Sequence, residues 1–283
     1  MSQVRIVTDS SCDLPTDVVE KLGISVVPLK IRFGATEYTD REDFTPTEFW
    51  QMCKESDELP STAAPSPGAF QKVFEDLADD GATGIVCLTI SAGLSATIEA
   101  AKVAKEAVSD RVDVRVIDSR SITVGLGSMA MQCAESAADG ADLATVSALG
   151  EDLVGRTQVW GALNTLEHLK KGGRIGAAQA TLGALLSIKP IIEIRDGVVE
   201  SPGKQRTRSR SLAYLVDIVR KQEGNIERLS VMQGDCPDLD GFLATLEDMY
   251  PGDIMVGDVG AVIGTHGGPG TMGVIMQLRD GSK

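Results

Sequence analysis

The sequence predicts an α/β protein made of two domains. In the first half of the chain, short runs of Val, Ile and Leu alternate with helical segments, which is typical of parallel βαβ units. The chain has 283 residues, more than one hydrophobic core usually holds, and the order of strands and helices changes near residue 155. We therefore expect one domain over residues 1–155 and a second over residues 156–283.

The first domain is expected to alternate strands with helices. Pro15 and Pro46 suit the first turns of helices, and Gly23 is a plausible helix end. The apolar runs predict strands over Val4–Val7, Ser25–Phe33, Ile85–Ile90 and Val112–Ile117. The segments between them predict helices over Ser11–Leu22, Thr45–Lys54, Gly68–Ala78, Ser95–Val108, Leu126–Ala138 and, as a link, Ala141–Arg156.

The second domain shows a different order of elements. The turn Arg195-Asp196-Gly197 is a strong hairpin signal between Pro190–Ile194 and Val198–Glu200. Further strands are expected over Thr157–Ala162, Arg228–Gln233, Ile254–Val259 and Gly273–Gln277. Helices are expected over Asn164–Lys171, Ala177–Ser187, Ser209–Gln222 and Pro237–Met249.

Turns rich in Ser, Thr, Gly or His follow several of these strands. A doubly wound sheet binds its ligand at the carboxyl ends of its parallel strands, so such turns suggest a small-molecule site built from weak polar groups. This pattern favours binding an anion over breaking a bond. The turns are Thr8-Asp9-Ser10-Ser11, Ser91 through Thr97, Asp118-Ser119-Arg120-Ser121 and Gly264-Thr265-His266-Gly267.

Of the side chains in these turns, those of Ser95 and His266 are the strongest candidates for binding an anion or for catalysis. Backbone amides at the helix start near Ser95, helped by its hydroxyl, can bind a carboxylate or phosphate. As a nucleophile, Ser95 would need a base, and only His168 and His266 exist. His168 fits an exposed helix position, whereas His266 lies in a stretch too glycine-rich for helix or strand. Asp9, at a strand end, is expected to cap the next helix.

Composition excludes several classes of function. The net charge is −14, and the first 150 residues hold 24 Asp and Glu against 12 Lys and Arg, so a nucleic-acid partner is not expected. Five scattered cysteines without a C-x-x-C pair, and two distant histidines, predict a reducing cytoplasm and no metal site. No apolar run approaches bilayer length, and no phosphate-binding glycine loop follows a strand. Low aromatic content, 4%, predicts an aliphatic ligand cavity.

Taken together, short segments along nearly the whole chain resemble the DegV family of bacterial fatty-acid-binding proteins. Each segment alone is a weak signal, but their joint order is specific. The matching segments are Thr8-Asp9-Ser10-Ser11 with Asp13-Leu14, Thr62 with Pro65-Ser66-Pro67, Ser91 with Leu94-Ser95 and Thr97, Asp118-Ser119, Lys171-Gly172-Gly173-Arg174-Ile175-Gly176, and Ile263-Gly264-Thr265-His266 with Gly268-Pro269-Gly270.

The resemblance implies an N-terminal three-layer α/β/α domain with a parallel sheet and a C-terminal α/β domain with a mixed sheet. It implies a long-chain fatty acid, such as palmitate, stearate or oleate, buried in the C-terminal domain. The carboxylate would bind Thr62 and Ser95 directly, with His266 in the supporting network. Further supporting candidates are Ser91, Thr97, Arg174, Thr265, Asp9 and Ser10.

The resemblance further implies a carrier without catalytic residues or a cofactor, which presents the carboxylate to a separate ATP-dependent fatty-acid kinase that forms acyl phosphate. Two departures bear on this: Ala63-Ala64 stand where the family often has Ser-Gln, and Ala96 stands where it often has Gly. The hydroxyls of the pattern are retained, and the preferred chain length stays open.

Two other hypotheses remain. One is a hydrolase or phosphotransferase that uses Ser95 and His266, although the sequence has no G-x-S-x-G nucleophile elbow. The other is an interaction protein in which the alternating Arg206, Arg208 and Arg210 present a docking face to an acidic partner.

Overall fold

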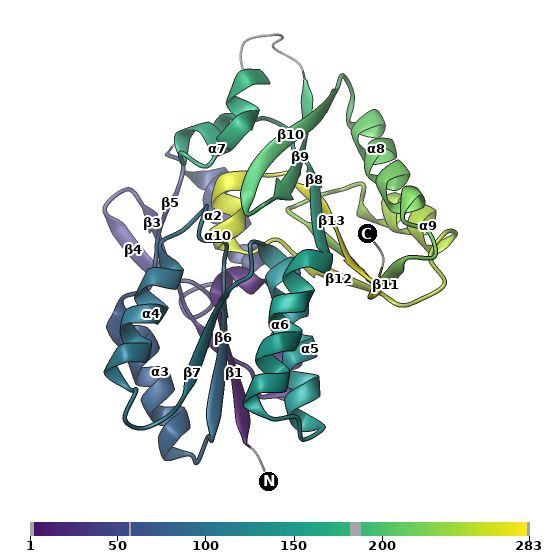
Figure 1. Cartoon of the computed structure of the whole chain (residues 1–283). Coiled ribbons are helices and arrows are strands. Elements are labelled where there is room, and N and C mark those ends of the chain that lie inside the picture. The colour runs from purple at the N-terminus through teal and green to yellow at the C-terminus, as the bar shows by residue number, and fades with distance from the viewer. Residues whose placement is uncertain (1–2, 57, 182–187, 282–283) are drawn as a thin grey trace.

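The computed structural model describes residues 3–56, 58–181 and 188–281 and shows three β-sheets with helices packed around two of them (Figure 1). The α/β fold class, with a parallel sheet and a mixed sheet, is confirmed. The division of the chain at residues 155 and 156 stays a prediction. It falls in the last turn of the helix α6 (Leu143–Arg156), which connects the part of the chain that forms the parallel sheet to the part that forms the mixed sheet.

The parallel sheet has four strands in the order β2-β1-β6-β7. Alternate residues of each strand point to opposite faces, so Val7, Ile85 and Cys87 pack on one side and Ile6 and Val86 on the other. Helices cover both faces and make three layers (Figure 1). The strands are β1 (Val4–Asp9), β2 (Ser25–Val27), β6 (Gly84–Thr89) and β7 (Val114–Asp118), and the helices are α3 (Pro67–Asp79) and α4 (Thr97–Ala107) on one face and α5 (Thr123–Ala138) and α6 on the other.

The mixed sheet has six strands in the order β10-β9-β8-β13-β11-β12, with β11 and β12 its parallel pair. Two helices, α8 (Arg208–Lys221) and α9 (Leu239–Glu247), pack against one face through residues such as Leu215 and Phe242. The opposite face turns toward the first half of the chain. The strands are β8 (Thr157–Ala162), β9 (Lys189–Arg195), β10 (Val198–Gln205), β11 (Ile226–Gln233), β12 (Ile254–Asp258) and β13 (Met272–Leu278).

A small antiparallel sheet, β4-β3-β5, was not predicted. The single strand expected over Ser25–Phe33 is in fact two strands, because Pro28 interrupts the backbone hydrogen bonding. After it, Leu29 donates its backbone N–H to the Ser10 hydroxyl at 3.0 Å, and the chain enters the second sheet. The three strands are β3 (Lys30–Phe33), β4 (Thr36–Thr39) and β5 (Ser61–Ala63), and helix α2 (Pro46–Glu55) lies between β4 and β5 in the chain.

The helix expected over Ser11–Leu22 is also divided. A 3₁₀ turn, η1 (Ser10–Cys12), comes first, and helix α1 (Thr16–Leu22) begins after Pro15. The helix expected over Asn164–Lys171 is shorter, α7 (Glu167–Lys171). Of the helix expected over Ala177–Ser187, residues 176–181 form the 3₁₀ helix η2 (Gly176–Thr181), and residues 182–187 lie outside the described residues.

The prediction that His266 lies in a turn was wrong, because Ala261–Gly267 form the helix α10. Glycine is tolerated at position 264 because the helix packs closely on α2: a Cβ there would lie 2.7 Å from Phe49 and 2.9 Å from Trp50. The glycines therefore permit close packing inside a helix. Positive φ angles occur after the helix, at Gly268 (77°) and Gly270 (81°).

Candidate functional site

An apolar cavity lies against the face of the mixed sheet that α8 and α9 leave uncovered. Its walls come from both halves of the chain and are mostly aliphatic, as the low aromatic content predicts. The volume of the cavity is about 80 Å³. Leu29, Ile90, Leu94 and Ile122 contribute from the first half, and Val159, Ile192, Ile194, Val262 and Ile275 contribute from the second.

Two glycines form part of the cavity wall on the sheet. Gly161 of β8 and Gly273 of β13 are direct partners across the antiparallel pair, and both line the cavity. Their strand neighbours Trp160, Met272 and Val274 belong to the core on the other face of the sheet, beside α8 and α9. Since side chains alternate along a strand, the cavity is open here because this pair has no side chains.

One end of the cavity carries polar side chains from four separate segments. Thr62 lies on β5, Ser95 in the turn after β6, Arg174 after α7 and His266 on α10, and all four line the cavity. The Thr62 hydroxyl and His266 Nε2 are 3.0 Å apart and form a hydrogen bond. The fold therefore brings together the three residues predicted to bind the head group, Thr62, Ser95 and His266.

The Ser95 hydroxyl is held by the residue that opens helix α4. Its oxygen lies 2.9 Å from the Thr97 hydroxyl and accepts a hydrogen bond from the Thr97 backbone N–H at 3.3 Å. Thr97 itself is fully buried. Among the described residues no hydrogen bond joins Ser95 to His266, so the structure does not form the Ser–His pair that a hydrolase needs.

The electrostatics of this end favour an anion with neutral hydrogen-bond donors around it. Burial, and then the nearby charges of Arg174 and His168, lower the pKa of His266 to about 4, so its imidazole is neutral at pH 7. Arg174 is half-buried and donates from Nε to the Leu94 carbonyl at 3.0 Å and from Nη1 to the Gly172 carbonyl at 2.7 Å. A fixed guanidinium beside neutral hydroxyls suits a single carboxylate.

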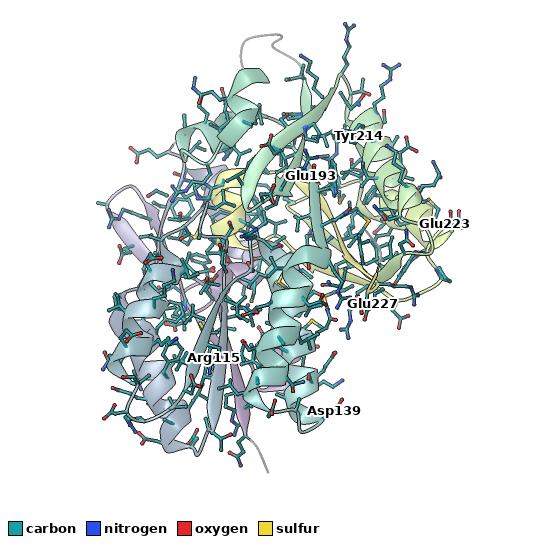
Figure 2. All side chains as sticks on the ribbon, in the orientation of Figure 1. Arg115, Asp139, Glu193, Tyr214, Glu223 and Glu227 are labelled. Atoms are coloured by element: carbon teal, nitrogen blue, oxygen red, sulfur yellow. The ribbon has the colours of Figure 1, made fainter. Side chains whose placement is uncertain are left out.

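The polar end also borders the surface. Thr62, Arg174 and His266 line a second depression on the outside of the protein, together with Ser61 and Lys171. Elsewhere, charged side chains such as Asp139, at the end of α5, and Glu223, after α8, project from the outer surface away from this site (Figure 2). A head group bound at Thr62 would therefore lie between the cavity and the exterior.

The supporting candidates hold the loops and do not line the cavity, with the exception of Arg174. Ser91 donates its hydroxyl to the Gly197 carbonyl at 2.6 Å, which ties the turn after β6 to the β9–β10 hairpin. The Thr265 hydroxyl bonds the Ala261 carbonyl at 2.8 Å within α10. These bonds position backbone around the site.

Asp9 is the buried cap that the sequence predicted. Its carboxylate accepts from the Ser11 backbone N–H at 3.0 Å and from the Ile90 N–H at 2.7 Å. Burial outweighs these bonds and raises the pKa of Asp9 to about 6. Asp9 thereby joins the ends of two neighbouring strands beneath the cavity.

Sequence reasoning misjudged His168 and missed Gly273. His168 was expected on an exposed helix face, but it is half-buried, hydrogen-bonds the Thr265 backbone, and has its pKa lowered mainly by burial. Gly268 is packed against it, since a Cβ there would lie 2.6 Å from the ring. Gly273 lies in an apolar strand without any signal of a binding site. Only its cross-strand pairing with Gly161 shows that it lines the cavity.

The expected arginine docking face is also corrected in part. Arg208 turns inward: its Nε and Nη2 bind the two carboxylate oxygens of Asp238 at 2.8 and 3.0 Å. Arg206 and Arg210 are exposed, so the three side chains do not present one face.

Among the described residues there is no cluster of three His, Cys, Asp or Glu side chains suited to a metal ion. No helix in the same residues is both long and apolar enough to cross a bilayer.

The fold and site define an α/β protein with a mostly aliphatic cavity that carries a group of polar side chains, Thr62, Ser95, Arg174 and His266. Comparison with known proteins places it further: the family described as "Uncharacterised protein, DegV family" matches residues 3–279. A DegV domain-containing protein of Streptomyces coelicolor is 36% identical over 98% of this chain and 99% of its own length. The chain belongs to the DegV family.

Solved structures show the same fold. A DegV family protein from Thermus thermophilus, described by its fatty-acid binding, is 33% identical over 98% of this chain and 100% of its own, with a TM-score of 0.89. A stearic-acid-binding protein from Eubacterium ventriosum is 27% identical over 98% of both chains, also with a TM-score of 0.89. A fatty-acid-binding DegV from Bacillus subtilis is 26% identical over 99% of this chain and 100% of its own, with a TM-score of 0.91.

Proposed function

We propose that this protein binds a long-chain fatty acid in the cavity, with its carboxylate at Thr62, Ser95 and Arg174. The observation that carries the proposal is a mostly aliphatic cavity that also presents two hydroxyls, a guanidinium and a neutral imidazole. The fatty-acid binding of the Thermus, Eubacterium and Bacillus relatives supports it. Palmitate, stearate and oleate are the candidate ligands.

The acyl chain supplies most of the affinity in this proposal. Each methylene removed from water contributes about 0.8 kcal/mol, so a long chain gains a large free energy from a cavity whose walls are mostly apolar. The head group then needs only to be paired, because a buried carboxylate without partners would offset that gain. Arg174 balances its charge, and the hydroxyls satisfy its oxygens.

The hydrogen bonds behind the two hydroxyls direct their protons toward the ligand. A neutral His266 that carries its proton on Nε2 donates to the Thr62 oxygen, which leaves the Thr62 hydroxyl free to donate to a carboxylate. Thr97 can act in the same way behind Ser95. Both hydroxyls would then be oriented donors before the ligand enters.

We further propose that the protein acts as a carrier that presents the carboxylate to a separate ATP-dependent kinase, which forms the acyl phosphate. Thr62, Arg174 and His266 line both the cavity and the outer depression, so a partner enzyme could reach the carboxylate without removing the acyl chain. A cytoplasmic location belongs to this proposal, and the five free cysteines agree with it.

Native mass spectrometry of the purified protein tests the binding proposal. We expect a co-purified fatty acid, or a one-to-one complex after addition of palmitate, stearate or oleate. Absence of all of these would contradict the proposal. Presentation is tested separately by adding a fatty-acid kinase and ATP to the loaded protein and measuring acyl phosphate. Binding without acyl phosphate would leave a carrier with a different recipient.

A further inference from the structure

Asp13 lies outside the cavity, yet it contacts the helix that carries His266. It follows η1 with a left-handed backbone, φ 50°, and its carboxyl group accepts a hydrogen bond from the backbone N–H of Gly260. Gly260 is the residue at which α10 begins. The fit is close, because a Cβ at position 260 would lie 2.5 Å from Asp13 Oδ1. Asp13 therefore meets the start of α10 directly.

Helix α10 has no side-chain cap of its own, since Gly260 has no side chain to bond its first amides. Asp13, from a distant part of the sequence, instead accepts from the N–H of the N-cap residue itself and so holds the start of the helix. At the other end of the helix, His266 bonds Thr62 at 3.0 Å. Both ends of α10 are therefore held by residues of the first half of the chain. Seven helical residues span only about 10 Å, so a shift at one end displaces the other.

We propose that Asp13 is a positioning residue, which holds Gly260 at the start of α10 and thereby fixes the His266 imidazole against the Thr62 hydroxyl. The inference deepens the proposed fatty-acid binding and rests on it for its functional meaning. Its structural part, the control of His266 by Asp13, can be measured without any ligand.

The acceptor oxygen of Asp13 can be retained while its charge is removed. Burial raises the pKa of Asp13 to about 8, with the neighbouring carboxylate of Asp40 adding to the rise and Arg41 opposing it. The carboxyl group is then largely neutral at pH 7, so Asn is a close replacement. Asp13→Asn keeps an oxygen for the Gly260 N–H, whereas Asp13→Ala removes it.

The chain has two histidines, so NMR of the imidazole protons can follow His266 through a pH titration of the unliganded protein. His168→Gln assigns the signals. We expect a low pKa in the parent protein, held down by burial, Arg174 and His168. In Asp13→Ala the pKa should rise by about one unit or more toward its usual value, because a displaced imidazole gains water. Asp13→Asn should match the parent.

Two further variants keep the test decisive. Gly260→Ala pushes against Asp13 Oδ1 and should raise the pKa of His266 in the same direction, even if Asp13→Ala fails to fold. Asp142→Ala removes a carboxylate acceptor from the start of another helix, α6, where Asp142 accepts from the Thr145 N–H, and should leave the pKa of His266 unchanged. An unchanged pKa in Asp13→Ala and Gly260→Ala overturns the inference. Equal shifts in Asp13→Asn or Asp142→Ala overturn it as well.

Palmitate binding then separates the two proposals. We expect Asp13→Ala to bind palmitate about tenfold more weakly than the parent, with Asp13→Asn within about twofold. Equal affinity of the Ala and parent proteins would contradict the positioning role. If the parent itself binds no fatty acid, the proposed function fails, while the pKa of His266 still decides whether Asp13 positions the helix.

Discussion

Thr62 and Ser95 each present a hydroxyl whose second hydrogen-bonding partner is already fixed within the protein. His266 stands behind Thr62 at 3.0 Å, and Thr97 stands behind Ser95 at 2.9 Å. Because the partners come from the protein, the hydroxyls need little reordering when a carboxylate arrives. This preorganisation lowers the entropic cost of binding.

Removing the Thr62 hydroxyl while keeping its shape should weaken fatty-acid binding. In Thr62→Val the carboxylate loses a donor and His266 loses its partner, so we expect a loss of about 1–3 kcal/mol in binding free energy, or roughly five- to 160-fold in Kd. Calorimetric titration of each protein with palmitate measures this loss of affinity. Thr62→Ser retains the hydroxyl and serves as the control. Equal affinity in the Val and parent proteins would exclude Thr62 from the head-group site.

The buried His266 should make part of the stability depend on pH. Its pKa is about 4 in the folded protein against 6.5 in its unperturbed form, so the unfolded chain binds the proton more tightly. The stabilisation is full above pH 6.5 and is lost as the pH falls toward 4, by up to about 3 kcal/mol. The free energy of unfolding by urea is measured for the parent protein and for His266→Gln at several pH values. The difference between the two proteins at each pH isolates the contribution of His266.

The comparison of the two proteins is needed because buried carboxyl groups change the stability with pH in the direction opposite to His266. The pKa values of Asp9 and Asp13 are raised by burial, so their contribution falls as the pH rises through their folded values. If His266→Gln and the parent protein lose stability in parallel between pH 6.5 and 4, His266 is not the buried neutral base that the structure shows.

At this scale the sequence predicted the residue types of the site better than their contacts. The family pattern identified Thr62, Ser95 and His266, which the fold does bring to one cavity end. No spacing in the chain could show that Thr62 would bond His266, because 204 residues separate them. His168 was misjudged for the same reason: its helix is short, and the loop that buries it is distant in sequence.

Among the elements, the pair of strands β8 and β13 determines where the cavity is open. Gly161 and Gly273 lie opposite each other, so the sheet presents bare backbone to the cavity at this point. A Cβ at position 273 would meet its nearest neighbour at 3.5 Å, an ordinary contact. Small side chains can therefore be added there without displacing the backbone.

Gly273→Val should obstruct the channel and leave the fold intact. Valine suits a strand, and its methyl groups would occupy space that the acyl chain needs. We expect the affinity for palmitate to fall by at least about tenfold, with Gly273→Ala intermediate. Gly155→Val adds the same side chain at an exposed position of α6, where a Cβ meets nothing within 4 Å. A Gly273→Val protein with parent affinity would place the acyl chain elsewhere.

Elements with strong periodic patterns were predicted, and short elements that depend on tertiary contacts were not. The alternation of strands and helices around the parallel sheet is visible in the sequence. The three residues of β5 carry no strand signal of their own, and they pair with β3 only because the fold brings them there. Helix α10 was missed because its glycines, which lower helix propensity, are compensated by packing on Phe49 and Trp50.

For the whole molecule, Arg156 joins the linking helix to the mixed sheet. Its side chain is 13% exposed and bonds Asp152 at 2.7 Å, Glu227 at 3.1 Å and the Leu278 carbonyl at 2.8 Å. Arg156→Met keeps the apolar stem but leaves these acceptors unpaired, so we expect a loss of about 1–3 kcal/mol in the free energy of unfolding by urea.

Arg115→Met is the matched control for this change. Arg115 lies on the outer edge strand β7 (Figure 2) and pairs with Asp113, which directly precedes that strand; both side chains are half exposed. An exposed ion pair contributes little to stability, so Arg115→Met should change the free energy of unfolding by no more than about 0.5 kcal/mol. Equal losses in the two variants would show that Arg156 does not fasten the two halves together.

The overall arrangement was predictable only in outline. The change in strand order near residue 155 indicated a second sheet with a different topology, and the structure has one. How the two halves meet depends on contacts such as Ser91 with Gly197 and Arg174 with Leu94, which join residues 106 and 80 positions apart. Such pairs leave no local trace in a single sequence.

The cavity walls come from both halves of the chain, so a ligand bound there would contact both halves at once. A bound acyl chain would then add apolar contacts to each half in the folded state only. Ligand binding stabilises the native state by RT ln(1 + [L]/Kd), which is about 2.7 kcal/mol at a hundredfold excess over Kd. The lifetime of the protein would then follow the supply of its ligand, and thermal unfolding would register the loaded and empty forms as two populations.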